Sequence, residues 1–236
     1  MTARKAASSI WLRPERASAG RPARRSRAEI TAAAIGIADR EGIDAVSMRR
    51  VAAELGTGAA SLYRYVETRE DLLDLMTDAV CGECPLPEPD GDWLAALIAM
   101  AERFRATLRR HAWLPGLVLT RPVIGPNGVT LLEYVLEVLA PHPADVATKL
   151  EAFAMINGIT ASFVQFELAG GPQAQERSVA YLQHVVASGR RPRLARLLAE
   201  GPQAPAEPAD RFGDILARIL TGLLGPRPRT QQRLGR

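Results

Sequence analysis

The sequence predicts an all-α protein with a small and a larger helical domain. Apolar residues recur at helical spacing along most of the chain, and segments that alternate at period two are almost absent. Glycine, proline and N-capping residues divide the chain into lengths that suit helices. Of the 236 residues, 47% are apolar and 24% are charged, which excludes collagen-like and largely disordered proteins.

The first part of the chain is predicted to hold a basic arm and four short helices. Residues 1–26 contain Pro14, Gly20 and Pro22, which favour a flexible arm. Ser47 is a good N-cap for the second helix, and the run from Thr68 to Asp71 has the pattern of a capping box that opens the fourth. The four predicted helices cover residues 27–40, 48–55, 59–66 and about 69–80.

A segment rich in proline, glycine and acidic residues, 81–92, is predicted to join the two domains. We expect the first domain to cover residues 27–84 and the second 91–225, followed by a disordered tail at 226–236. The helices predicted in the second domain cover residues 93–110, 114–121, 128–139, 144–169, 173–188, 194–198 and 209–224.

Charge is unevenly distributed along the chain, although the net charge is only +4. Residues 1–27 carry eight Lys or Arg and one acid, residues 28–189 carry twelve basic and twenty-one acidic residues, and residues 190–236 carry ten basic and four acidic ones. Basic ends on an acidic body are common in proteins that bind a polyanion. The alternative is that the arginine-rich ends only keep the chain soluble.

Several classes of protein are excluded by the pattern of apolar residues and cysteines. No apolar segment follows the basic N-terminus, so a secretory signal is not predicted. The longest stretch without a charge, 152–166, has 15 residues and includes several polar ones, so we expect no membrane span. Two cysteines, Cys81 and Cys84, cannot form a disulfide framework. The sequence therefore predicts a cytoplasmic protein.

Residues 47–66 predict a helix-turn-helix motif. Two short helices are joined at Gly56, and the apolar residues expected to face inward are Val51, Ala52, Leu55 and Leu62. The outward candidates on the second helix are Ala60, Ser61, Tyr63, Arg64 and Tyr65, which include hydroxyl and guanidinium groups that can contact phosphates and base edges. The alternative is a helical hairpin with a polar face and no nucleic-acid partner.

Five short runs carry a resemblance to a known family. They are Glu41-Gly42, Ser47-Met48-Arg49-Arg50-Val51-Ala52, Leu55-Gly56, Leu62-Tyr63-Arg64-Tyr65-Val66 and Arg69-Glu70-Asp71-Leu72-Leu73. With these runs, residues 27–80 resemble the DNA-binding domain of the TetR family of transcriptional regulators. Tyr65 stands where the family usually has His, and Arg69 where it usually has Lys, but both can still bond a phosphate.

The resemblance implies a role for individual residues in binding double-stranded DNA. Arg49 matches a position that reads guanine from the start of the second helix, which Arg can do bidentately. Thr57, Ala59, Ala60 and Ser61 fall at the leading end of the recognition helix. Tyr63, Tyr65 and Arg69 match phosphate contacts, and Arg64 falls where the family varies most, so we expect it to read the operator. The arm with Arg24 and Arg25 either enters a minor groove or is only a solubilising tail.

Residues 93–224 resemble the ligand-binding and dimerisation domain of the tetracycline-repressor subgroup. The matching residues are Trp93, Phe104, Thr120-Arg121-Pro122 and Leu131-Leu132-Glu133. The resemblance implies a homodimer in which the 144–169 and 209–224 helices form a four-helix bundle with their copies. Apolar residues such as Phe153, Ile156 and Phe166 support this. The alternative is that they form an intramolecular core.

By the same resemblance, a pocket for a small effector would lie between the first four helices of the second domain. Its candidate lining residues are Met100, Phe104, Trp113, Leu117, Thr120, Arg121, Val135, Asn157 and Gln165. The histidine that binds drug-chelated magnesium in the tetracycline-binding member has no counterpart in residues 116–119, so we expect no metal and no cofactor. A rather apolar effector is predicted instead. The alternative for Met100, Phe104 and Trp113 is plain core packing.

An enzyme is not predicted, because the three histidines are far apart and no nucleophile elbow, P-loop or zinc-protease motif is present. The predicted function is a transcriptional regulator, most simply a repressor that a small effector releases from a pseudo-palindromic operator. The alternative is a DNA-binding regulator without a small ligand, controlled by a protein or by oxidation of Cys81 and Cys84. This pair has CxxC spacing but no further ligands for zinc.

Overall fold

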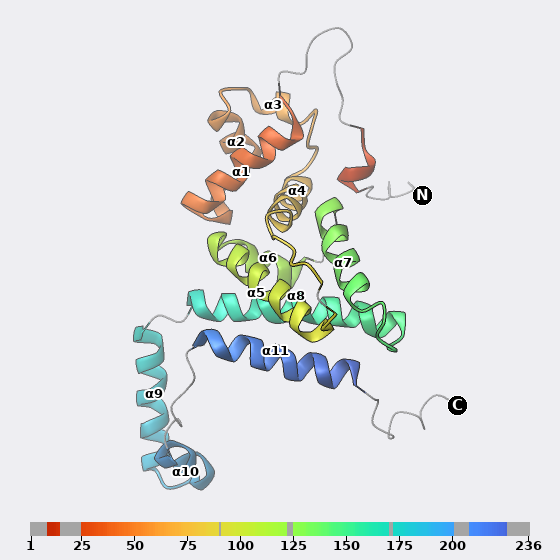
Figure 1. Ribbon diagram of the computed structural model, residues 1–236. Coiled ribbons are helices and arrows are strands. Elements are labelled where there is room, and N and C mark those ends of the chain that lie inside the picture. Colours follow the sequence, from red (N-terminus) through yellow and green to blue (C-terminus); the bar gives the residue numbers. More distant parts are fainter. Residues whose placement is uncertain are drawn as a thin grey trace, which may run out of the picture.

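The computed structural model describes residues 9–14, 25–89, 91–121, 125–169, 172–200 and 208–225. Within these ranges the chain forms eleven α-helices, two single 3-10 turns and no strand, which confirms the predicted all-α class (Figure 1). The elements are η1 (Ile10–Leu12), α1 (Arg27–Glu41), η2 (Ile43–Ala45), α2 (Met48–Glu54), α3 (Ala59–Leu62), α4 (Arg69–Cys81), α5 (Trp93–Arg110), α6 (Leu114–Thr120), α7 (Pro126–Val138), α8 (Val146–Ala169), α9 (Pro172–Ala187), α10 (Pro192–Glu200) and α11 (Pro208–Leu224).

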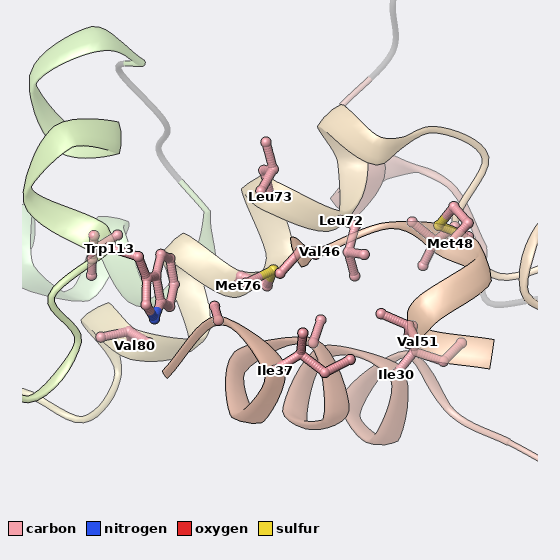
Figure 2. Packing of buried hydrophobic residues seen from close by; sticks show 14 of the residues in the cluster. Ile30, Ile37, Val46, Met48, Val51, Leu72, Leu73, Met76, Val80 and Trp113 are labelled. Carbon is pink, nitrogen blue, oxygen red and sulfur yellow. The ribbon is translucent and has the colours of Figure 1, made fainter. Parts of the chain in front are cut away.

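Helices α1 to α4 form the first domain, and each begins where the sequence supplies a cap or a turn. Ser26 forms a capping box with Glu29 at the start of α1, and Thr68 forms one with Asp71 at the start of α4. Gly56 adopts a positive φ of 62° in the turn after α2, a conformation that glycine reaches without strain. The apolar faces of α1, α2 and α4 meet in one core, which includes Ile37 and Met76 (Figure 2).

The recognition helix is shorter than the sequence predicts. Helix α3 ends at Leu62, whereas a continuous helix to residue 66 was expected. After it, the backbone N–H groups of Tyr65 and Val66 both donate to the carbonyl of Leu62. This tight turn directs both side chains into the core, so burial in the tertiary structure ends the helix.

Helices α5 to α11 form the second domain. Helices α8 and α11 lie side by side at its base, and α5 packs against both (Figure 1). A second core cluster fills the space between α5, α7, α8 and α11, with Leu97, Val135, Ile156 and Phe212 fully buried. Helices α9 and α10 project away from this body and contact each other.

The two domains share one continuous apolar core. Phe104, Leu108 and Trp113 of the second domain belong to the same buried cluster as Met76 and Val80 of α4. The indole of Trp113 lies beside Val80 at this junction (Figure 2). A movement of α5 or α6 would therefore change the packing of the first domain directly.

Helix α8 is, among the residues described, the one helix long and apolar enough to cross a membrane by length and composition. Its uncharged stretch, residues 152–166, is shorter than the helix, which was predicted at 144–169 and extends over Val146–Ala169. In the structure, α8 packs against α5, α6 and α11, and Glu167 near its end pairs with Arg105 and Arg109 of α5. One side of α8 therefore packs into the second domain, although only 28% of its apolar window is buried.

Candidate nucleic-acid interface and its link to the second domain

The helix-turn-helix is held together as its sequence pattern predicts. Ser47 caps α2 by accepting a hydrogen bond from the N–H of Arg50. Val51, Ala52 and Leu62 are buried, which packs α2 against α3. The N–H of Thr57 donates to the carbonyl of Ala52 at 2.9 Å and closes the turn between the helices.

The outer face of the motif presents basic and hydroxyl groups. Arg49, Ala60, Tyr63 and Arg64 are exposed, whereas Thr57, Ala59 and Ser61 are half-buried. A guanidinium N–H of Arg64 donates to the hydroxyl of Ser61 at 3.2 Å. Residues 55–66 contain no Asp or Glu, so no acidic side chain of this stretch opposes a phosphate.

Arg49 and Arg50 are neighbours in sequence but have different surroundings. Arg50 pairs with Glu41 at 2.6 Å and with Glu54 at 2.9 Å, and these hydrogen bonds raise its pKa further. Arg49 forms no ion pair with any residue that the structure describes. Of the two, only Arg49 has a guanidinium with no ion-pair partner in the part of the chain that the structure describes, which leaves it available to a ligand.

The prediction that Tyr65 faces outward is wrong. Its side chain is 8% exposed and belongs to the core of the first domain. The physical reason is the burial of its ring against the other helices of the first domain, which ends α3 at Leu62. Its carbonyl accepts a hydrogen bond from Arg27 at 3.0 Å, which ties the end of the recognition helix to α1.

Arg69 has a structural role that the sequence did not indicate. Its guanidinium donates to the carbonyl of Val46 at 3.0 Å and to that of Ile43 at 3.2 Å, which holds the start of α4 against the turn before α2. The side chain remains exposed. Arg25 similarly donates to the carbonyl of Leu55 at 2.7 Å, beside the turn of the motif. Arg24 lies outside the described residues.

The nine predicted effector residues are spread over two core clusters and partly exposed positions. Met100 and Val135 belong to the core cluster of the second domain. Phe104 and Trp113 belong to the cluster shared with the first domain, and Leu117 packs against it. The core-packing alternative fits these buried side chains.

The predicted polar anchors are also engaged or exposed. Asn157 donates to the carbonyl of Phe153 in its own helix at 2.9 Å, and Thr120 donates to that of Gly116 at 2.7 Å. Gln165 is exposed. To bind a ligand, Asn157 and Thr120 would each have to give up a hydrogen bond within their own helix. Gln165 could contact a ligand only at the protein surface.

Arg121, which is predicted as a ligand anchor, makes contacts between the domains. Its guanidinium pairs with Glu70 of α4 and with Asp74 of the same helix, the latter at 2.7 Å. Burial, together with the nearby Asp71, raises the pKa of Asp74. Arg121 thus attaches the end of α6 to α4.

A second contact attaches the start of α7 to α4. The buried carboxylate of Asp78 accepts hydrogen bonds from the backbone N–H groups of Asn127 at 3.3 Å and Gly128 at 2.9 Å, and from the amide side chain of Asn127 at 3.1 Å. This carboxylate therefore caps α7 from another helix. Glu70, Asp74 and Asp78 recur every fourth residue, which is the sequence signal that places them on one face of α4.

His111 joins the two domains at the end of α5. Its ring nitrogens lie 2.8 Å from the carboxylate of Asp39 in α1 and 3.1 Å from that of Glu83. The indole N–H of Trp113 donates to the same carboxylate of Asp39 at 2.7 Å. Burial acts to raise the pKa of Glu83, but hydrogen bonds from His111 and Arg110 outweigh it and hold that pKa below its ordinary value.

The two cysteines are poorly suited to redox sensing. Burial raises the pKa of Cys81 to about 12 and that of Cys84 to about 11. Both groups are therefore protonated thiols at neutral pH, and the thiolate is the reactive form. Burial of the two thiols thus disfavours the redox-controlled alternative.

A cavity of about 490 Å³ lies where the α7–α8 connection meets the end of α11. His142, Asp145, Thr148 and Leu223 are among the residues that line it. None of the nine predicted effector residues does. The ring of His142 packs edge-on against Trp93, with the ring centres 5.1 Å apart.

Comparison with known proteins identifies both domains. Residues 30–76 match the model of bacterial regulatory proteins of the tetR family, and residues 84–225 match that of the tetracyclin repressor-like C-terminal domain. The HTH-type transcriptional repressor DrrR1 of Streptomyces coeruleorubidus is 39% identical over 229 residues, which cover 91% of this chain and 83% of that protein. The class A tetracycline repressor of transposon 1721 from Escherichia coli is 27% identical over 201 residues, covering 81% and 87% of the two chains.

Solved structures of ActR from Streptomyces coelicolor have the same fold. The apo form is 31% identical, with a TM-score of 0.75, and the match covers 85% of this chain and 95% of that one. The complex of ActR with actinorhodin is 30% identical, with a TM-score of 0.71 and coverage of 85% and 96%. Since the family models together span both domains, the chain belongs to the TetR family: it is a DNA-binding helix-turn-helix transcriptional repressor and not an enzyme.

Proposed function

We propose that the protein is a homodimer that binds a pseudo-palindromic operator through α2 and α3 and is released by a small, rather apolar effector. It would act on DNA in the cytoplasm. The observation that carries the proposal is the outer face of the helix-turn-helix, where residues 55–66 contain no acid and Arg49 has no ion-pair partner among the described residues. The domain that carries this face shares its core with the second domain.

The DNA part of the proposal rests on chemistry suited to a major groove. An arginine can donate two parallel hydrogen bonds to a guanine, and Arg49 has no competing acid among the residues described. Arg64 and Ser61 already contact each other, so they would contact neighbouring groups of the DNA. Tyr63 is exposed and is a candidate for a phosphate contact.

The homodimer is supported by the apolar surface of α8. Phe166 is 76% exposed, and Leu150, Met155 and Leu168 of the same helix are also exposed. Soluble monomers rarely leave such a set of large side chains in water. A second copy related by a two-fold axis would cover it, and two recognition helices would then meet two half-sites.

The effector is supported by likeness to relatives and by the contacts between domains. ActR, which has the same fold, has been solved in complex with actinorhodin. In this chain, Arg121 and Asp78 attach the ends of the α6–α7 connection to α4. A ligand that moved α6 or α7 would therefore change the position of the DNA-binding domain.

The test begins with the selection of binding sites from a randomised duplex library by the purified chain. We expect recovery of an inverted repeat, which fluorescence anisotropy at two salt concentrations would show to bind much more tightly than scrambled DNA. Recovery of no shared sequence would contradict operator recognition. Actinorhodin and magnesium–tetracycline then serve as probes of release, and we expect magnesium–tetracycline to have no effect.

A regulator without a small ligand remains the second candidate, because the predicted apolar lining residues pack in the core. The two candidates differ in a linked pair of effects. A true effector raises the melting temperature and releases DNA at the same concentrations, since both follow from preferential binding to one state. If no compound in a broad apolar panel produces both effects, the ligand-free regulator is the better description.

A further inference from the structure

Residues 9–14, which the sequence assigned to a flexible arm, are folded onto the body of the protein. They contain the single turn η1 and lie beside α4 (Figure 1). Ile10 is 1% exposed, whereas Leu12 in the same turn is 80% exposed. The segment therefore has a buried and a solvent face, as a docked segment does. We refer to residues 9–14 as the N-terminal strap.

The strap is tied to the start of α4 by an arginine. Arg13 pairs with Glu67 at 3.0 Å and with Asp71, and the hydrogen bond that Arg13 donates to Asp71 raises the pKa of Arg13. Asp71 also accepts the N–H of Thr68 at 3.1 Å as part of the capping box of α4. The strap thus contacts the cap that positions the helix leading out of the DNA-binding motif.

The strap is also tied to the end of the recognition helix. Arg27 donates to the strap carbonyls of Arg13 at 2.9 Å and Ile10 at 3.2 Å. The same guanidinium donates to the carbonyl of Tyr65 at 3.0 Å. One side chain therefore links the strap directly to the backbone that follows α3.

At its other side the strap reaches the second domain. The ring of Trp11 and the carboxylate of Asp78 close in on the backbone of Gly125 so tightly that a side chain at this position would collide with both. Gly125 is the N-cap of α7, and Asp78 caps the first turn of the same helix. Trp11 therefore covers the point at which α4 holds α7.

We propose that the N-terminal strap couples the two domains, because it links the end of the recognition helix, through Arg27, to the first turn of α7, through Trp11. By holding α4 and α7 in one arrangement, the strap keeps the DNA-binding domain in the conformation that binds its operator, which lowers the entropy cost of binding. Loss of the strap would let α4 and the start of α7 open locally more often, and DNA binding would then have to restore their order. Only the DNA-binding consequence rests on the proposed function.

Hydrogen exchange tests the proposal without any ligand. The full-length double variant Trp11→Ala/Arg13→Ala removes the two strap side chains that reach α7 and α4. Leu12→Ala is the matched control, since it truncates an exposed apolar residue of the same turn. We expect amide exchange in α4 and in the first turn of α7 to rise about tenfold in the double variant, with α8 unchanged. Exchange equal to that of Leu12→Ala would overturn the proposal.

Operator affinity provides the second readout, measured on the inverted repeat recovered by selection. We expect the double variant to bind it about three- to tenfold more weakly than Leu12→Ala does. Faster exchange with unchanged affinity would show that the strap is only structural and would overturn the coupling. If selection recovers no operator, the proposed function fails while the exchange experiment still decides whether the strap holds the domains.

A gentler pair of variants serves if the double variant does not fold. Arg13→Gln removes only the charge, and Trp11→Phe removes only part of the ring that lies against Gly125. Each is expected to increase exchange in its own contact region, α4 for Arg13→Gln and the start of α7 for Trp11→Phe. Unchanged exchange in both regions would contradict the strap.

Discussion

Arg49 and Arg50 provide a matched pair for testing base recognition. Arg49→Ala should lower the affinity for the selected operator by about 1–3 kcal/mol and relax the preference at one base pair, because a bidentate contact would be lost. Arg50→Ala is the control, since that guanidinium is already engaged by Glu41 and Glu54. A repeat of the selection with each variant measures the preference directly. If Arg49→Ala selects the same base at every position as the unmodified protein, another residue must recognise that base pair.

The cysteines should be inert in the folded protein. With a pKa of about 11 for Cys84 and about 12 for Cys81, at most about one thiol in a thousand is ionised at pH 8. We expect slow labelling by iodoacetamide at pH 8, faster labelling as pH rises toward 11, and rapid labelling in urea. Peroxide should leave operator affinity unchanged. Loss of DNA binding on mild oxidation, restored by a reductant, would contradict this and favour redox control.

The helices of this chain could be predicted from sequence because their signals are local. Ser47 and Thr68 cap helices at the predicted positions, and the apolar spacing of α5 gives its bounds without any tertiary information. The end of α3 could not be predicted in this way, since it depends on the burial of Tyr65 against other helices. For the same reason the docking site of the strap could not be predicted: Ile10 and Trp11 are unusual apolar residues among arginines, but the residues that they contact lie far along the chain.

The candidate site was predictable to a similar degree. The inward residues of the helix-turn-helix followed from spacing, and Val51 and Leu62 are buried as expected. Arg121 was identified from the resemblance, but its pairing with α4 needs the tertiary structure. The acidic residues at every fourth position of α4 were visible in the sequence, yet only packing shows that they contact α6 and α7.

The cap that α4 places on α7 should contribute measurably to stability. Asp78→Asn keeps the size of the side chain but removes the charge, so we expect a loss of about 1–3 kcal/mol in the free energy of unfolding. Glu137→Gln, which neutralises an exposed carboxylate on α7, is the control. Urea unfolding of both variants gives the comparison. Equal midpoints would mean that the buried carboxylate of Asp78 contributes nothing beyond its shape.

An operator with two half-sites requires a dimer that carries two recognition helices. The exposed apolar residues of α8 are the surface that we propose for this dimer. Phe166→Arg should weaken dimerisation by about 10²- to 10⁴-fold, because two symmetry-related aromatic rings would each lose about 1.5–3 kcal/mol of burial and the two charges would repel. Val129→Arg is the control, since Val129 is exposed on α7 rather than on α8. Sedimentation equilibrium measures both. A dimer dissociation constant for Phe166→Arg equal to that of the unmodified protein would place the interface elsewhere.

If the interface is on α8, the Phe166→Arg protein should bind an isolated half-site but lose the tighter binding to the inverted repeat, because only a dimer can occupy both halves at once.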